Sequence, residues 1–124
     1  MVTNMAKILV LDDVFDAVVL IKKILERQQH QVVIFTKEEE ALQYVKEHEV
    51  DLAILDIKLK KINGIEVLRK FKKILPALKT IMLTGYPTVE TAREALRFGA
   101  NEYCTKPIEK IDLEEKVRET LAAH

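Results

Sequence analysis

The stretch VDLAILDIKLKK, residues 50–61, decides the fold of this 124-residue chain. Its apolar run from Leu52 to Leu55 reads as a short strand, and the strand ends on one carboxylate, Asp56, which three lysines follow. A strand that is apolar at successive positions, rather than at every second one, indicates a sheet buried on both faces. The stretch therefore raises the question of why a buried strand should end on an acid beside so much positive charge.

Similar short β-type runs recur along the chain. They occupy residues 7–11, 32–35, 52–55, 80–83 and 102–104. The segments between them have helical periodicity, so a strand–helix unit is repeated five times. Such a repeat predicts an α/β fold with parallel strands, right-handed crossovers and helices on both faces of the sheet.

Local signals predict where several helices begin and end. Thr36, with Glu39 three residues later, has the spacing of a capping box for the second helix. The third helix is expected between Gly64 and Pro76, and Asp112 is the expected N-cap of the fifth.

Apolar stripes mark the buried faces of two helices. The stripe of the first helix is expected to consist of Val18, Ile21, Ile24 and Leu25. The stripe of the fourth is expected to consist of Val89, Ala92 and Leu96, with Gly99 just past its end.

Composition narrows the class of protein. The chain is 48% hydrophobic and has 20 basic and 20 acidic residues, so we expect one domain spanning residues 1–124 and no direct binding to nucleic acid. A basic segment (58–73) and an acidic one (38–51) are expected to be solvated faces, with a docking patch as the alternative. The single cysteine, Cys104, is expected to be buried and unreactive. The absence of a signal peptide or membrane-spanning run predicts a soluble, cytoplasmic protein that does not bind membranes.

Five polar residues stand where the predicted strands end. They are Asp12, Asp13, Asp56, Thr84 and Lys106. The carboxyl ends of parallel strands meet at one edge of the sheet, so these side chains are predicted to converge there. Three carboxylates at close range repel one another, and Mg²⁺, which prefers oxygen ligands and sites shared with phosphate, would compensate them. With a lysine added, the edge could hold a phosphoryl group beside a nucleophilic aspartate.

The motifs that carry these residues resemble one known family. The segments LDD (11–13), LDIKLKKINGIEVL (55–68) and MLTGYPTVETAREALRFGANEYCTKPI (82–108) are similar, in order and spacing, to the receiver domain of two-component response regulators, which has the CheY-like fold. The likeness covers almost the whole chain. It implies a five-stranded parallel sheet in the order 2-1-3-4-5 flanked by five helices.

The resemblance also implies residue roles at the acidic edge. Asp56 would accept a phosphoryl group from a phosphohistidine of a histidine kinase or phosphotransferase. Mg²⁺ would be bound by Asp13 directly, by Asp12 largely through water, by Asp56 and by the backbone carbonyl of Lys58. Lys106 would pair with the phosphoryl oxygens.

A conformational switch is implied as well. Thr84 would hydrogen-bond to the phosphoryl group, and Tyr103 would turn inward as Thr84 moves. The signal would then leave through the fourth helix, fifth strand and fifth helix, towards an effector that the sequence does not identify.

Each of these residues has a simpler reading when it is taken alone. Asp12 or Asp13 is equally suited to capping the first helix. Thr84 alone suits a strand, Tyr103 a core position and Lys106 the surface. The five matches in order are what favour a phosphoryl site.

The chain departs from the usual receiver pattern in two loops. Leu59 and Lys60 stand where many receivers have a Met-Pro pair, and Gly85 stands where alanine is common. These departures, with Lys61 beside them, are expected to affect phosphoryl lifetime and partner choice rather than competence.

Other functions remain as alternatives. A phosphohydrolase with an aspartate nucleophile would be expected to carry a second acid two residues later, where this chain has Lys58. A docking module that works without phosphorylation would not need the intact acidic set. We therefore expect a signalling domain rather than an enzyme, at most with slow self-phosphorylation and self-dephosphorylation.

The organisation of the whole protein is less constrained. We expect a stand-alone receiver or phosphorelay intermediate, monomeric or weakly dimeric when phosphorylated. A receiver cut from a longer transcriptional regulator is the alternative.

Overall fold

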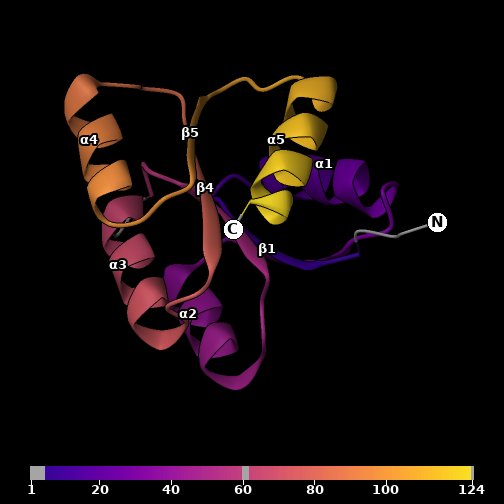
Figure 1. Cartoon of the computed structure of the whole chain (residues 1–124), viewed down its shortest axis with the longest axis horizontal. Helices are drawn as coiled ribbons and strands as arrows, with labels where there is room; N and C mark the ends of the chain where they lie inside the picture. The colour runs from indigo at the N-terminus through magenta and orange to yellow at the C-terminus, as the bar shows by residue number, and fades with distance from the viewer. Residues whose placement is uncertain (1–4, 60–61, 124) are drawn as a thin grey trace.

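A computed structural model of the chain describes residues 5–59 and 62–123, and within these ranges five strands form one parallel sheet (Figure 1). The strands are β1 (Lys7–Leu11), β2 (Gln31–Phe35), β3 (Leu52–Asp56), β4 (Lys79–Thr84) and β5 (Glu102–Thr105). Their order is β2-β1-β3-β4-β5, which confirms the predicted order and fold class. Lys60 and Lys61, which were predicted to affect phosphoryl lifetime and partner choice, lie outside the described residues.

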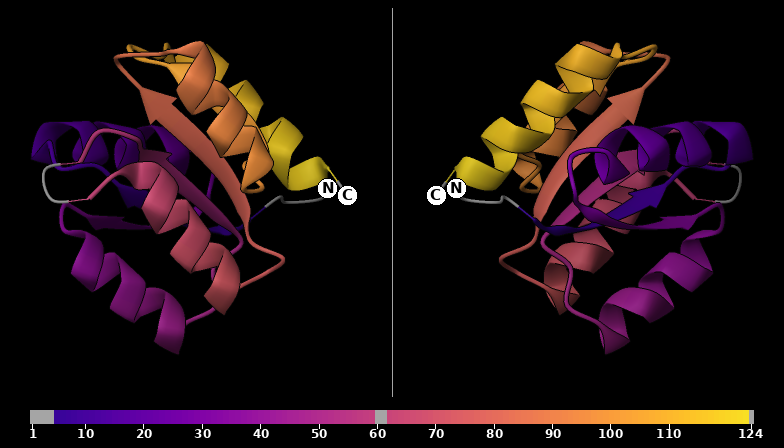
Figure 2. Two further views of the ribbon diagram at one scale, coloured as in Figure 1. Left: turned by 90° about the vertical axis from the view of Figure 1, so that its left-hand side faces the viewer. Right: turned by 90° about the vertical axis from the view of Figure 1, so that its right-hand side faces the viewer.

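Five helices alternate with these strands in the described ranges. They are α1 (Phe15–Glu26), α2 (Glu38–Glu47), α3 (Gly64–Ile74), α4 (Val89–Arg97) and α5 (Lys110–Ala122). Helices α1 and α5 cover one face of the sheet, and α2, α3 and α4 cover the other (Figures 1 and 2). No helix of the described residues is both long enough and apolar enough to cross a membrane.

Successive strand residues bury their side chains on opposite faces, as a pleated sheet requires. Leu9 and Leu11 of β1 pack under α2 and α3, whereas Ile8 and Val10 pack under α1 and α5. Each of these four side chains is at most 1% exposed. The sheet is therefore buried on both faces, and its polar residues are left to the strand ends.

Two predicted helix starts are wrong. The N-cap of α2 is Lys37, without a side-chain bond, and Thr36 lies in the bend between β2 and the helix. Helix α5 begins at Lys110 after Glu109, so Asp112 lies in its first turn, where a negative charge interacts favourably with the helix dipole.

The predicted apolar stripe of α4 is also wrong. Val89 and Leu96 are 70% and 61% exposed, and Ala95 is the buried residue of this helix. The helix lies over the β4–β5 end of the sheet and beside α3, so only a narrow strip of it is covered. The end of α4 is as predicted, with Gly99 at a φ of 97°.

Candidate functional site

The five polar residues predicted at the strand ends are placed at the carboxyl edge of the sheet by the parallel pairing. Asp12 and Asp13 follow β1, Asp56 ends β3, Thr84 ends β4 and Lys106 follows β5. Strand β3 lies between β1 and β4, and Asp56 is paired in register with Leu83, next to Thr84. Residues that are up to 94 positions apart in the chain are thereby brought to one edge.

Three carboxylates form the centre of this edge. Asp12, Asp13 and Asp56 each offer an oxygen atom, and these atoms lie within 4.8 Å of one another. Asp12 and Asp56 are buried, and Asp13 is half-buried. A donor set made only of carboxylate oxygens fits a hard divalent cation such as Mg²⁺, which would offset the mutual repulsion of the three charges.

Lys106 brings a positive charge to this cluster of carboxylates. Its Nζ forms an ion pair and hydrogen bond with Asp12 Oδ2 and a second ion pair with Asp56 Oδ2 at 3.4 Å. Burial lowers the pKa of Lys106, but its bonds to the two carboxylates outweigh burial, so the pKa lies above its usual value. The ammonium therefore stays charged at neutral pH.

Asp56 is held in an environment that disfavours its negative charge. Burial and the neighbouring Asp12 carboxylate raise the pKa of Asp56, and Lys106 and the N–H of Lys58 oppose them only in part. That N–H lies 3.3 Å from Asp56 Oδ1. The anion of Asp56 would gain from further positive charge at this edge.

The two carboxylates after β1 do not cap α1. The N-cap of α1 is Val14, which has no side-chain capping bond, and its N–H donates to Asp12 Oδ1 at 3.0 Å. Asp12 thus fixes the turn between β1 and α1, so the simpler reading of these acids as helix caps is wrong.

The backbone of the β3–α3 loop is closed tightly beside Asp56. Lys58 forms an isolated antiparallel bridge with Asn63, and the Gly64 N–H donates to the Ile57 carbonyl at 2.6 Å. A Cβ on Gly64 would lie 2.0 Å from the Asp56 carbonyl oxygen. The sequence indicated a glycine before the third helix, but only the structure shows that its missing side chain lets α3 approach the phosphoacceptor candidate.

Thr84 is buried and its hydroxyl is already engaged. Thr84 Oγ1 accepts the Tyr86 N–H at 3.0 Å, which fixes the start of the β4–α4 loop. The hydroxyl still has a proton to donate, so it could bind an acceptor at the edge of the sheet.

Tyr103 lies half-buried on β5 and is bonded to the start of α4. Its hydroxyl lies 2.7 Å from Thr91 Oγ1 and accepts the Thr88 N–H at 3.3 Å. Thr88 and Thr91 form the capping box of α4. Sequence reasoning missed both threonines, although their i, i+3 spacing is a capping signal.

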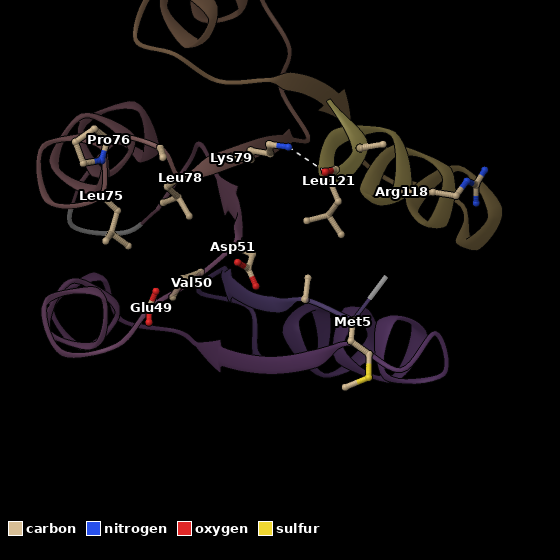
Figure 3. Close-up of a pocket in the computed structure, with 13 residues that line it drawn as sticks. Met5, Glu49, Val50, Asp51, Leu75, Pro76, Leu78, Lys79, Arg118 and Leu121 are labelled. Atoms are coloured by element: carbon tan, nitrogen blue, oxygen red, sulfur yellow. Dashed lines mark hydrogen bonds between the residues drawn. The ribbon is translucent and has the colours of Figure 1, made fainter. Parts of the chain in front are cut away.

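A hollow of about 660 Å³ lies at the opposite, amino edge of the sheet (Figure 3). Its walls come from the ends of β1, β3, β4, α3 and α5. Two of its charged side chains are bound to backbone groups: Lys79 Nζ donates to the Leu121 and Ala123 carbonyls, and Asp51 accepts the Lys7 N–H at 2.8 Å. These groups hold element ends together, and we assign this hollow no function.

The sheet order and the carboxylate–lysine edge together define an α/β protein of the doubly wound class, with a polar site at the topological switch point. Residues 8–118 match the model of the response regulator receiver domain, and the chain belongs to that family. Receiver domains are signalling domains that histidine kinases phosphorylate, and they generally bind Mg²⁺ at an acidic pocket.

Individual relatives agree with this assignment. The transcriptional regulatory protein ZraR of Escherichia coli K12 is 32% identical over 115 residues, which are 93% of this chain and 26% of ZraR. The regulatory protein VanR of Enterococcus faecium is 33% identical over 93% of this chain and 49% of VanR. The chain thus spans about a quarter to a half of these relatives.

A solved structure is similar over nearly its full length. A CheY-like response regulator receiver domain from Methanospirillum hungatei JF-1 is 37% identical, with a TM-score of 0.91 and 94% coverage of each chain. The BeF3-activated DrrB receiver domain is 28% identical, with a TM-score of 0.87 over 96% of this chain and 99% of that one.

Proposed function

We propose that Asp56 is the phosphoacceptor of this receiver domain and takes its phosphoryl group from a phosphohistidine of a histidine kinase or phosphotransferase. The observation that carries the proposal is the pairing of Lys106 with both Asp56 and Asp12 inside a three-carboxylate cluster. A carboxylate oxygen of Asp56 attacks phosphorus in line, the phosphorus–nitrogen bond breaks, and the imidazole leaves with its electron pair.

The neighbouring groups stabilise and orient the transferred group. Asp12, Asp13, Asp56 and the Lys58 carbonyl would hold Mg²⁺, which, when bound, neutralises charge on the phosphoryl oxygens. The Lys106 ammonium contacts the same oxygens, because it already lies 3.4 Å from Asp56 Oδ2. The Thr84 hydroxyl donates to one oxygen from the end of the neighbouring strand.

The response would pass from Thr84 to Tyr103. The β4–α4 loop is bonded at both of its ends. The Tyr86 N–H donates to the Thr84 hydroxyl, and the Thr88 N–H donates to the Tyr103 hydroxyl. A shift of Thr84 towards the phosphoryl group therefore pulls on the start of α4, and the Tyr103 ring moves inward. The exposed surface of α4, β5 and α5 would present the change to an effector.

The test is a comparison of intact masses after incubation with acetyl phosphate and Mg²⁺. Wild-type protein gains one phosphoryl group, and Asp56→Asn does not. Asp16→Asn is a matched control, since Asp16 is an acid of the α1 first turn outside the cluster. Equal phosphoryl uptake by wild type and Asp56→Asn would overturn the assignment of Asp56 as the phosphoacceptor.

Residues 1–124 are proposed to form a single receiver domain. Two alternatives remain for the protein that contains this domain. In the first, the receiver acts alone, as a phosphorelay intermediate or by docking a target. In the second, which the names of the longer relatives support, it is the receiver of a transcriptional regulator. An immunoblot of host lysate separates the two by the size of the protein that carries this domain.

A further inference from the structure

Helix α4 is held mainly at its two ends. Ala95 is the buried residue of this helix, and most of its outer surface is exposed. The first turn is bonded to Tyr103 through Thr88 and Thr91. The last turn contacts α3, beside which α4 lies (Figure 2). Because so little of α4 is covered, the contacts at its ends decide where it lies on the sheet.

An aromatic ring joins the last turn of α4 to α3. Phe98 is the C-cap of α4, and its half-buried side chain packs against the core. The guanidinium carbon of Arg69, on α3, lies 4.8 Å from the centroid of this ring, which is cation–π geometry. The guanidinium carbon of Arg97 lies 5.5 Å from the same centroid. Arg69 therefore contacts Phe98 from the neighbouring helix, whereas Arg97 contacts it from α4 itself.

A second side chain of α3 reaches the same turn. Gly99 follows Phe98, and a Cβ added to Gly99 would lie 2.9 Å from Lys72 Cε. Lys72 is three residues beyond Arg69, so both side chains leave the same side of α3. The Lys72 ammonium is fixed in turn by the Leu78 carbonyl, to which it donates at 2.6 Å. The end of α4 is thus placed against α3 by two separate contacts.

The opposite end of α4 is the one that the phosphoryl site would move. In the proposed function, a shift of Thr84 pulls on the first turn of α4. Helix α4 is a single element of nine residues, so a change in its direction also moves its last turn relative to α3. The contact between Arg69 and Phe98 depends on a distance of a few ångströms, and such a movement weakens it. The contact therefore favours the position that α4 has in this structure.

We propose that the Arg69–Phe98 contact is a latch that holds α4 in its unphosphorylated position and so sets how readily phosphorylation changes the surface of α4, β5 and α5. The proposal rests on the proposed function, because it needs a phosphoryl site that moves α4, and it adds a control on that movement. Exposed cation–π contacts are modest, so loss of the latch should shift the balance between the two positions by about two- to fivefold. A ligand that binds the moved position then binds more tightly by a similar factor.

The experiment is a titration with beryllofluoride in excess Mg²⁺, followed by the amide NMR signals of α4. Arg69→Gln and Phe98→Leu are each expected to bind beryllofluoride about two to five times more tightly than wild type, because α4 is less firmly held. The double variant should bind no more tightly than the tighter single variant, since both changes remove one contact. Phe98→Tyr keeps the ring and should retain the wild-type affinity.

Two control variants separate the latch from a general effect of charge. Lys70→Gln removes a positive charge from an exposed position of α3 next to Arg69. Arg97→Gln removes the cation that moves together with Phe98. Both should bind beryllofluoride with the wild-type affinity. Arg69, Lys70 and Arg97 are exposed, so these variants should fold even if Phe98→Leu does not.

Several outcomes overturn the latch. They are a wild-type affinity in Arg69→Gln, an equal gain in either control variant, and gains of the single variants that multiply in the double variant. A Phe98→Tyr affinity equal to that of Phe98→Leu also overturns it, because the ring would then not be the partner of Arg69.

The two proposals fail in different ways. If wild type takes up no phosphate from acetyl phosphate, or if Asp56→Asn takes up as much, the phosphoacceptor assignment fails and the latch fails with it. If phosphate uptake depends on Asp56 but beryllofluoride leaves the α4 signals unchanged, or binds all variants equally, only the latch is wrong.

Discussion

The two edges of the sheet use charge in opposite ways. At the amino edge, the polar side chains of Lys79, Asp51 and His30 are bound to backbone groups of neighbouring elements. At the carboxyl edge, Asp12 and Asp56 are buried together with one lysine between them, and the pKa of Asp56 is raised. The first arrangement stabilises the fold, whereas the second holds a carboxylate whose negative charge is unfavourable there and would be stabilised by a cation.

The hollow of about 660 Å³ lies at the amino edge, where charged groups already have partners (Figure 3). The difference between the edges lies in their charges: Lys79 and Asp51 are bound to backbone groups, whereas the pKa of Asp56 is raised by burial and by Asp12.

The largest expected effect concerns the close approach of α3 to the carboxyl edge. Gly64→Ala places a Cβ 2.0 Å from a backbone oxygen that cannot move away without displacing β3, so we expect a loss of about 3 kcal/mol in unfolding free energy. Denaturant unfolding measures it. Gly85→Ala is the control, because no atom lies within 4 Å of its Cβ, and it should change stability by less than about 0.5 kcal/mol. Equal stability of both variants would contradict the packing of α3 on Asp56.

A metal titration tests the difference in charge between the two edges of the sheet. Mg²⁺ should raise the unfolding free energy of wild type, by about 2.7 kcal/mol at a hundred times its dissociation constant. Asp13→Asn should lose most of this gain at the same Mg²⁺ concentration, because one of the three carboxylates is gone. Asp16→Asn should keep it. Thermal unfolding in MgCl₂ and in EDTA gives the comparison, and an undiminished gain in Asp13→Asn would argue against a metal at this edge.

The amino edge should affect stability without affecting phosphate uptake. Lys79→Met removes the donor to the Leu121 and Ala123 carbonyls at the end of α5, at a cost of about 1.5 kcal/mol. Lys73→Met, an exposed lysine of α3, should be nearly neutral. Denaturant midpoints measure both. A Lys79→Met protein as stable as wild type, or one deficient in phosphate uptake, would break the distinction between the edges.

The smallest expected effect is a pH dependence at the amino edge. Burial lowers the pKa of His30, whose Nδ1 accepts the Ala6 N–H at 3.1 Å. His30 of the unfolded protein therefore takes up a proton below about pH 6.5, whereas His30 of the folded protein stays neutral. The unfolding free energy falls as the pH is lowered, by about 1.4 kcal/mol for each unit by which the pKa of His30 differs between the folded and unfolded states.

His30→Asn is the variant for this measurement, because it keeps an acceptor but does not titrate. The stability of wild type relative to His30→Asn should decline from pH 7 to pH 5, in urea melts at fixed ionic strength. A constant difference across this range would show that His30 titrates equally in the folded and unfolded states.

Much of the fold could be predicted from periodicity, because each strand is a short apolar run and each connection is helical. The predictions that were wrong concern residues whose environment depends on distant elements. Thr36 has a capping pattern, but it lies in the bend after β2, and α2 begins one residue later than predicted, with Lys37 as its N-cap. Val89 and Leu96 form a helical stripe, but the sheet under α4 ends too soon to cover them.

The sequence by itself determined the alternation of strands and helices and put acids, a threonine and a lysine at the strand ends, because these are local properties of the chain. Only the tertiary structure decided what those residues do to one another. It paired Lys106 with Asp12 and Asp56, fitted Gly64 against the Asp56 backbone, and brought Lys58 onto the ring of Tyr86. The physical reason is that charge repulsion, close packing and cation–π contact depend on distances of a few ångströms, and such distances exist only after parallel strands from separate parts of the chain have been brought together.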